Sequence, residues 1–304
     1  MKKIFPSFLY LISGTLFTLI ACGLLATPTV PPFQSTEAPF PTKTIAASTA
    51  TNIPPTLSFI PEMGSTLVGK DGMTLIFVPE GNFIMGGDDM SDQKPIHTVY
   101  LDSFWIDQTE VTNKQYALCV TSGGCTSPAN ISSSTRANYY GNSEFDNFPV
   151  IYVNWHQAKA YCLWAGRDLP TEAQWEKAAR GTDGRLYPWG DDIDKSRYNM
   201  YGDDTNTVGN YEMGKSKYGV YDMAGNVQEW VKDIFQWDYY TTLGENTSNP
   251  QGPSMVPAGD LEVRGLRGGS WADSEFTVKS AFRSQMWPDN SHFTIGFRCA
   301  QSFP

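Results

Sequence analysis

The chain has 304 residues, of which 40% are hydrophobic and only 18% are charged, a composition typical of a folded protein. Its formal net charge is −10 and its pI is about 4.8, which excludes the basic surface that nucleic-acid-binding proteins carry, so we expect no nucleic-acid partner. The same acidic balance excludes a basic patch that would hold the protein on an anionic lipid surface. Any contact with a membrane must therefore come from another feature of the chain.

Residues 1–22 have the pattern of a bacterial export signal. Two lysines precede an apolar run over residues 4–21, and Cys22 follows directly. Residues 19–22 read LIAC, which is similar to the lipobox of bacterial lipoproteins, where the cysteine receives the lipid and becomes the new N-terminus. A plain transmembrane anchor is the alternative, since roughly 18 apolar residues can cross a bilayer, but polar and helix-breaking residues interrupt the run. We expect a lipid anchor on Cys22, and either anchor leaves the domain outside the cytoplasm.

Residues 23–65 form the predicted linker. Thr, Pro, Ala and Ser dominate it, and it carries almost no charge. Such a composition buries too little apolar area to offset the entropy of ordering the chain. Its prolines keep it extended, so we expect a semi-rigid stalk that holds the domain at residues 66–304 away from the membrane.

The cysteines indicate an oxidising compartment. With Cys22 set aside for the lipid, four cysteines remain, and Cys119 and Cys125 are close enough for a local loop that two glycines help to turn. Cys162 and Cys299 are left for a second, long-range bridge. Zinc binding is the rival interpretation, but the chain has no Cys-x-x-Cys and only three histidines, which favours two disulfides.

The first predicted elements of the domain are strands. Residues 73–79 are rich in β-forming residues, and residues 80–87 predict a turn, a short strand and a Gly-rich loop. Residues 97–106 alternate polar and apolar side chains, which predicts one half-buried strand.

Three helices are predicted next, each from a capping box at its start. The boxes pair Thr112 with Gln115, Asn154 with Gln157, and Thr171 with Gln174, and the helices should end near Gly123, Gly166 and Gly181. In the second helix, Trp155, Ala158, Tyr161 and Cys162 share one face and are expected to be buried.

After Gly181 no long helical periodicity remains, and the chain reads as loops with short apolar pieces such as residues 293–297. Three helices, short strands and many loops predict an α+β domain with low regular secondary-structure content and an aromatic core. Such a fold needs additional staples, and disulfides or bound calcium are the usual ones.

Seven ordered motifs resemble one family, that of the formylglycine-generating enzymes, or sulfatase-modifying factors. They cover nearly all of residues 66–303, and in chain order they are EVTN at 110–113 with Gln115 and Tyr116, PVIYVNW at 149–155, RDLPTEAQWEKAARG at 167–181, YPWG at 187–190, GVYDMAGNVQEW at 219–230, LRGGSW at 266–271 and GFRC at 296–299. The resemblance implies the family's fold, which is related to that of C-type lectins. Most of these residues, Arg283 and Arg298 among them, are expected to have structural roles.

The chemistry of that family requires two active-site cysteines that bind copper(I), and soft thiolates suit copper(I) well. In the corresponding stretch, residues 271–283, there is no cysteine, and the resemblance places Asp273 and Glu275 where the two thiols would be. The family's second disulfide also has Ala179 and Ser280 at its two ends, whereas Cys162 and Cys299 keep the first. We therefore expect neither copper nor formylglycine-generating activity. Ligand spacing for an iron site and the Gly-x-Ser-x-Gly and P-loop motifs are also missing.

The resemblance also implies a structural calcium site. Its ligands would be the side chains of Asp222 and Glu229 with the carbonyl groups of Gly225 and Val227, since calcium takes six to eight oxygen ligands. A loop fixed by its own hydrogen bonds is the alternative. A second family site would use Asn199 and the carbonyl of Met200, with Asp203 or Asp204 as the weakly matched acidic ligand.

A binding surface is the remaining interpretation. Residues 271–294, where the enzymes hold their active site, carry mixed aromatic and polar side chains that suit recognition. The candidates are Trp271, Asp273, Glu275, Trp287 and His292. We expect a ligand-binding or scaffold module whose partner is an unidentified protein or surface ligand, with membrane contact through the lipid. An oxidoreductase of the same family with chemistry invisible in the sequence, and a component of a neighbouring signalling complex, are the alternatives.

Overall fold

The structure, a computed structural model, describes residues 60–244, 247–256, 259 and 261–303. The predicted export signal, Cys22 and the linker up to residue 59 lie outside the described residues. The chain divides into two units, Met1–Leu57 and Ser58–Pro304, and everything below concerns the second. Among the helices that the structure describes, none is both long and apolar enough to cross a membrane.

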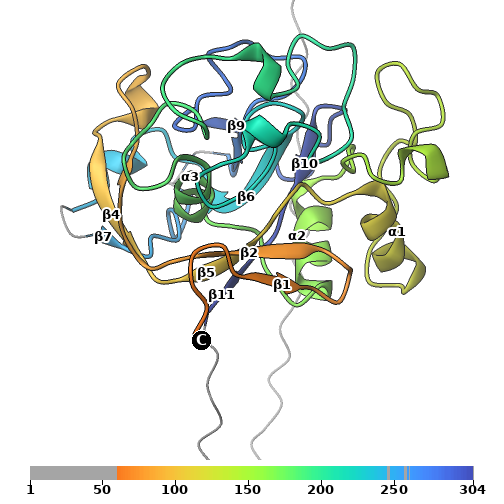
Figure 1. Cartoon of the computed structure of the whole chain (residues 1–304), viewed down its shortest axis with the longest axis horizontal. Helices are drawn as coiled ribbons and strands as arrows, with labels where there is room; N and C mark the ends of the chain where they lie inside the picture. The colour runs from red at the N-terminus through yellow and green to blue at the C-terminus, as the bar shows by residue number, and fades with distance from the viewer. Residues whose placement is uncertain (1–59, 245–246, 257–258, 260, 304) are drawn as a thin grey trace, which may run out of the picture. The chain divides into compact units, whose positions relative to one another are not determined.

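Short elements joined by long loops make up the domain (Figure 1). The helices are α1 (Asn113–Thr121), α2 (Trp155–Trp164) and α3 (Glu172–Arg180), with single 3₁₀ turns between elements. The strands are β1 (Thr66–Val68), β2 (Thr74–Val78), β3 (Gly81–Met85), β4 (His97–Leu101), β5 (Phe104–Asp107), β6 (Gln228–Ile234), β7 (Thr247–Ser248), β8 (Arg264–Arg267), β9 (Ser284–Met286), β10 (Ile295–Phe297) and β11 (Ala300–Ser302). The predicted α+β class with low regular content is confirmed.

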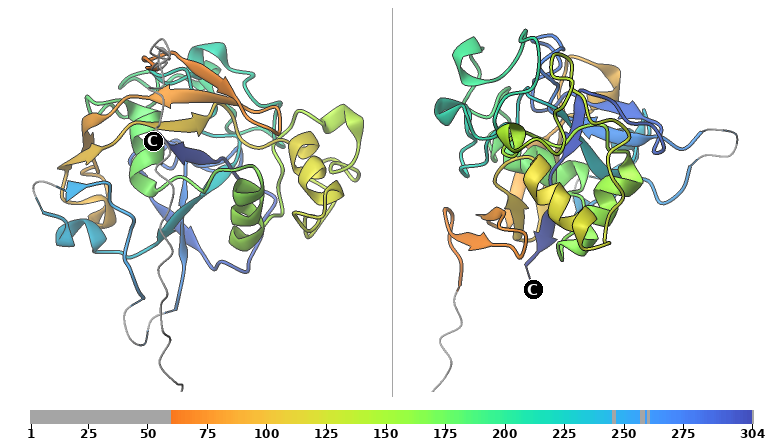
Figure 2. Two further views of the ribbon diagram at one scale, coloured as in Figure 1. Left: turned by 90° about the horizontal axis from the view of Figure 1, so that it is seen from below. Right: turned by 90° about the vertical axis from the view of Figure 1, so that its right-hand side faces the viewer.

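Three small sheets hold the described strands, in the orders β1-β2-β5-β11, β10-β6-β8-β9 and β3-β4-β7. In the first sheet β11 pairs antiparallel with β5, so the beginning and the end of the domain meet there. Helix α3 packs against β3 and β4 of one sheet and against β6 and β8 of another, which places it between them. Helices α1 and α2 lie next to each other on one side of the domain (Figure 2).

All three helices begin at the predicted capping boxes. In each box the N-cap side chain accepts from the backbone N–H of the glutamine three residues later, and the side chain of that glutamine accepts from the N-cap backbone N–H. The buried face predicted for α2 is also correct. Both predicted disulfides are confirmed, Cys119–Cys125 beside α1 and Cys162–Cys299 between α2 and the C-terminal strand. The second bridge lies in the larger aromatic core with Trp230 and Phe297.

Two predictions about strands were wrong. Residues 97–106 form two strands in different sheets, because the chain turns at Asp102, whose backbone N–H donates to the Asn249 side chain at 2.9 Å. Residues 228–234 were expected to be a loop but form β6, a central strand paired on both sides. This strand is largely buried on both faces, so its sequence lacks the alternation that marks a half-exposed strand.

Candidate functional site

The segment between β8 and β9, residues 268–283, is fixed at both ends by one carboxylate. Glu172 lies in the first turn of α3, where burial disfavours its charge, but Arg283 and Arg267 hold the pKa of this carboxyl below its usual value. Arg267 Nη1 and Arg283 Nε each donate to Glu172 Oε1 at 2.8 Å, and Arg283 Nη2 donates to Oε2 at 2.9 Å. All three side chains are buried.

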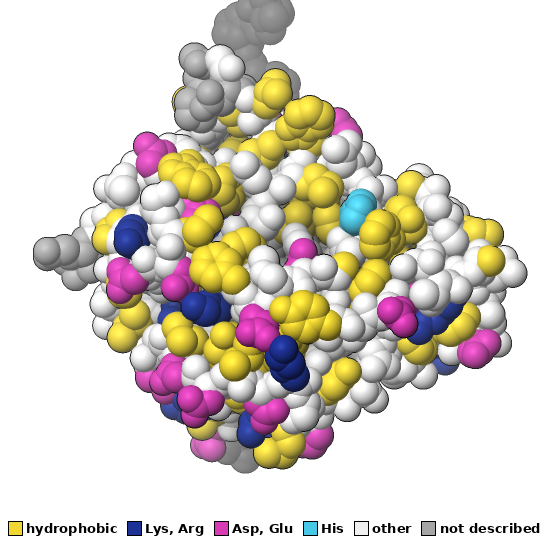
Figure 3. Space-filling model, turned by 90° about the horizontal axis from the view of Figure 1, so that it is seen from above, with side chains coloured by type: hydrophobic (Ala, Val, Ile, Leu, Met, Phe, Trp, Pro, Cys, Tyr) yellow, Lys and Arg dark blue, Asp and Glu magenta, His cyan; other side chains and the backbone are white. Residues whose placement is uncertain are grey.

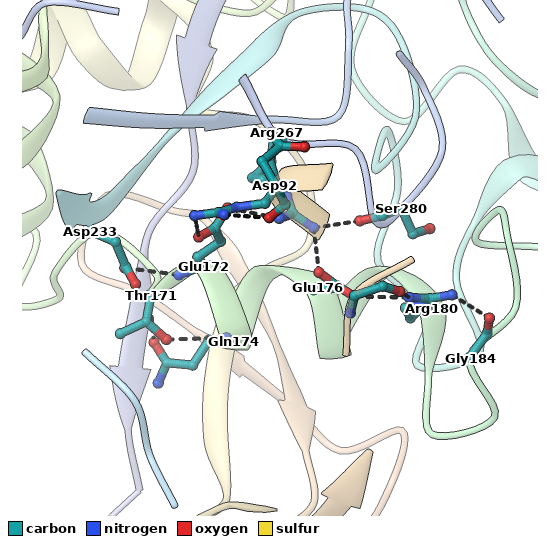
Figure 4. Close-up of polar contacts among 12 residues, drawn as sticks. Asp92, Thr171, Glu172, Gln174, Glu176, Arg180, Gly184, Asp233, Arg267 and Ser280 are labelled. Carbon is teal, nitrogen blue, oxygen red and sulfur yellow. Dashed lines mark hydrogen bonds and ion pairs between the residues drawn. The ribbon is translucent and has the colours of Figure 1, made fainter. Parts of the chain in front are cut away.

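One turn further along α3, Glu176 extends this network (Figure 4). It accepts from Arg267 Nη2 at 2.6 Å and from Arg180 Nη1 at 2.9 Å, and Arg267 also donates to the carbonyl of Ser280 at 2.5 Å. The Glu172 N–H donates to Asp233 of β6 at 2.9 Å. Buried ion pairs joined by hydrogen bonds in this way hold a loop in one geometry. Segment 268–283 therefore stands on a rigid base made by α3.

Asp273 lies within this anchored segment in a saturated set of hydrogen bonds. Its Oδ2 accepts from the Ser270 backbone N–H at 2.8 Å, from Ser270 Oγ at 2.7 Å and from Gln228 Nε2 at 2.8 Å. Three donors on one oxygen stabilise a carboxylate as a structural acceptor. The position that the family resemblance gave to an active thiol is thus occupied by a side chain that ties the segment to β6.

Glu275 is half-exposed and pairs with Lys195 at 2.6 Å. Trp189 stacks between Tyr187 and Tyr198, with ring centroids 5.4 and 5.3 Å apart and nearly parallel planes. Glu275 thus lies on the surface, as predicted.

Trp271 lies below the surface rather than on it, because its side chain is only 7% exposed and its ring packs against Phe293 with centroids 5.8 Å apart. The ring of His292 also packs against Phe293, with centroids 4.1 Å apart. Its Nδ1 is 2.8 Å from Thr294 Oγ1. Partial burial lowers the pKa of His292, although the nearby Asp273 carboxylate favours its charged form. Trp271 and His292 thus both pack on Phe293, which joins the start and the end of the stretch 271–294.

Trp287 is separate from that group and is 53% exposed. It lines a groove of about 670 Å³ together with residues of the α2 N-terminus and of the stretch before β8. The lining residues are His156, Leu261, Glu262, Trp287, Pro288, Asp289 and Asn290. No pattern in the sequence predicts that residues 261–262 line this groove, because they lie far from Trp287 along the chain.

The face at the top of Figure 1, to which loops of the last third of the chain contribute, appears in Figure 3. Hydrophobic side chains there lie among acidic and basic ones, and the acidic ones are the more numerous.

The two predicted acidic calcium ligands, Glu229 and Asp222, differ in how far hydrogen bonds already occupy their oxygens. Arg298 donates to both oxygens of Glu229, at 2.7 and 2.6 Å, and Trp175 Nε1 donates to Oε2 at 2.9 Å, so this carboxylate is fully engaged. Asp222 Oδ2 accepts from the Gly209 N–H at 2.6 Å. Burial, followed by the charges of Asp222 and Glu229, raises the pKa of the neighbouring Glu110. Glu110 Oε2 is buried with no hydrogen-bond donor, which is the kind of atom a cation would satisfy.

Gly225 and Asn199 meet at the backbone. The N–H of Asn226 donates to the Asn199 carbonyl at 2.9 Å, and a Cβ on Gly225 would come within 2.3 Å of that oxygen. Asp204 is occupied by Ser133 and Thr135, which donate to its Oδ2 at 2.5 and 2.8 Å, and so it is not free to serve the second site with Met200. Val227 is fully buried. Within the part of the chain that the structure describes, no three His, Cys, Asp or Glu side chains gather closely enough to hold a metal ion.

All four cysteines of the described domain are paired. Cys119 is bonded to Cys125, and Cys162 to Cys299, so the described residues contain no free thiol. Residues 271–283 contribute none.

The fold and this anchored segment define an α+β domain that displays a loop segment on a helix-supported base. More specifically, the chain belongs to the sulfatase-modifying factor family, because the Sulfatase-modifying factor enzyme 1-like domain matches residues 65–303. The family predicted from the seven motifs is therefore confirmed.

Three similar proteins illustrate the range of the family. "Serine/threonine-protein kinase pkn1" of Chlamydia caviae is 34% identical over 248 residues, which cover 75% of this chain and 38% of that protein. Formylglycine-generating enzyme of Streptomyces coelicolor is 33% identical over 281 residues, 73% of this chain and 87% of that enzyme. The structure of PvdO from Pseudomonas aeruginosa superposes with a TM-score of 0.64 at 25% identity, covering 80% of this chain and 100% of PvdO. The chain thus spans only 38% of the length of its kinase-named relatives.

Proposed function

We propose that this chain is a non-oxidising member of its family, a ligand-binding or scaffold module held outside the cytoplasm by a lipid on Cys22. The observation that carries the proposal is the state of the cysteines. A formylglycine-generating reaction through copper(I) needs two thiolates, and every cysteine of the described domain is consumed in a disulfide.

The anchored segment supports a binding role in place of catalysis. Its base is built from buried ion pairs, while Glu275 presents a carboxylate to solvent. Trp287, which follows β9, adds an exposed aromatic ring nearby in the sequence. A rigid support lowers the entropy cost of ordering the surface when a partner binds. The match to part of a protein named as a kinase also favours a domain that can be combined with other functional units.

The enzymatic alternative is tested with a cysteine-containing sulfatase peptide, copper(I) and oxygen. Mass spectrometry should find the peptide cysteine unchanged with this chain, while the formylglycine-generating enzyme of Streptomyces coelicolor, run in parallel, converts it to the aldehyde. Conversion by this chain would overturn the proposal and establish the oxidoreductase alternative.

The lipid anchor is tested separately by metabolic labelling with a radioactive fatty acid in a bacterial host. The wild-type chain should incorporate the label and enter the detergent phase on phase separation, and Cys22→Ser should do neither. The pair Cys119→Ala and Cys125→Ala is the matched control, because it removes two cysteines of the domain and should leave labelling intact. Labelling of Cys22→Ser would contradict the anchor.

A further inference from the structure

The groove beside Trp287 is a preorganised site. The turn that carries Trp287 is closed by the Asn290 N–H, which donates to the Trp287 carbonyl at 3.0 Å. It is fixed to α2 because the Trp155 N–H donates to the Pro288 carbonyl, also at 3.0 Å. The backbone that carries the exposed indole is therefore already ordered, which lowers the entropic cost of binding.

Both polar walls of the groove are supported by the same buried tryptophan. Glu262 pairs with Arg264, whose guanidinium lies 3.9 Å from the ring centroid of Trp155. On the opposite wall Asp289 lies 3.4 Å from His156, whose ring packs edge-on against Trp155 at 5.3 Å. Trp155 itself is held by its Nε1, which donates to the Val231 carbonyl at 2.8 Å.

The charges of the groove select the class of ligand. Glu262 already pairs with Arg264 and Asp289 lies beside His156, so a basic peptide gains less from these carboxylates than from unpaired ones, whereas their remaining lone pairs can still accept from hydroxyl groups. The described lining residues include two carboxylates and neither Lys nor Arg, which disfavours a phosphate or other anion. What the groove offers is a flat aromatic face, flanked by carboxylate and amide groups that accept and donate hydrogen bonds. A groove of about 670 Å³ is also in the size range that holds a small organic ligand.

We infer that this groove binds a neutral saccharide. The apolar C–H face of a sugar ring stacks on Trp287, and its hydroxyl groups donate to Glu262 and Asp289 and contact Asn290. Leu261, which is 71% exposed, extends the apolar side of the platform. The inference rests on the proposed function, because it names the ligand class of the proposed binding surface.

The experiment combines an array of neutral glycans with fluorescence titration of the purified chain by maltotriose, cellotriose and triacetylchitotriose. At least one neutral glycan should bind saturably, and Trp287→Ala should weaken that binding by at least about tenfold, equivalent to 1.4 kcal/mol. Trp287→Phe should retain part of the affinity, because it keeps an aromatic face.

Trp237→Ala is the matched control, since Trp237 is also 53% exposed but does not line the groove, and it should bind as the wild type does. Asp289→Asn keeps an acceptor and removes the charge, so it should weaken saccharide binding only modestly. A parallel array of Lys- and Arg-containing peptides tests the competing occupant.

Three results would overturn the inference: an empty glycan array, equal binding by wild type and Trp287→Ala, or capture by basic peptides alone. The last result would leave the proposed binding function standing, whereas oxidation of the sulfatase peptide would remove the proposed function without bearing on the groove. Unchanged thermal unfolding of each variant excludes a loss of folding as the cause.

Discussion

Arg267 and Arg283 donate to the same oxygen of Glu172, each at 2.8 Å, although one ends β8 and the other precedes β9. One carboxylate of α3 thus closes the loop segment that joins these neighbouring strands. The segment is held through buried charges rather than through a disulfide, and this arrangement makes its geometry sensitive to a single side chain.

Glu172→Gln should strongly destabilise the domain. The substitution leaves two buried guanidinium groups without their shared carboxylate, and breaking a buried ion pair from one side costs about 3–5 kcal/mol. The measurement is the free energy of unfolding from denaturant titration. Glu144→Gln, at an exposed position, should change it little. A loss from Glu172→Gln no greater than that of the control would show that the network does not support the fold.

Asp233 should make stability fall as pH rises. Burial, followed by the charge of Glu172, raises the pKa of this carboxyl to about 7. Between about pH 4 and 7 the folded state keeps a proton that the unfolded state has already lost, so the free energy of unfolding decreases with pH. Asp107, with its pKa raised to about 7 by burial, contributes in the same direction.

Asp233→Asn should therefore flatten this pH dependence, because the amide can still accept from the Glu172 N–H and does not ionise. Thermal unfolding measured from pH 4 to pH 8 gives the comparison. Asp203→Asn, which changes an exposed carboxyl, should leave the wild-type slope. Identical slopes for wild type and Asp233→Asn would contradict a raised pKa for Asp233.

The two disulfides should contribute unequally to stability. Cys162 and Cys299 are separated by 137 positions and Cys119 and Cys125 by 6, so loop entropy predicts a loss of about 5 kcal/mol for Ala at the first pair and about 2 kcal/mol at the second. Each double variant serves as the control for the other in denaturant unfolding. Equal losses would mean that loop entropy does not govern these bridges.

A structural calcium ion remains a prediction, with Asp222 as its best-supported acidic ligand and Glu110 beside it. Calcium should raise the melting temperature, EGTA should lower it, and Asp222→Asn should abolish the difference between the two conditions. Glu144→Gln, which changes an exposed carboxyl outside both proposed calcium sites, should keep the difference. If wild-type protein melts at the same temperature with calcium and with EGTA, the site does not exist.

The sequence was sufficient to predict the helices and the disulfides, because capping boxes and cysteine spacing act locally. It was insufficient for β6, whose residues are buried on both faces and carry no alternation. Two ion pairs, Glu229 with Arg298 and Glu172 with Arg267, join residues that are far apart in the sequence. No local spacing along the chain therefore predicts them. Trp271 was misplaced on the surface for a related reason, since its burial depends on Phe293, which follows much later.

Helix α3 carries the two carboxylates, Glu172 and Glu176, that anchor residues 268–283. Because Glu172 and Glu176 fix both ends of residues 268–283, the exposed positions between them, such as Ala272 and Ser274, carry little of the folding energy. Substitutions at such positions should therefore change the free energy of unfolding little. A domain built this way can diverge in what it recognises while its framework stays constant, and it offers a natural starting scaffold for selecting new binders.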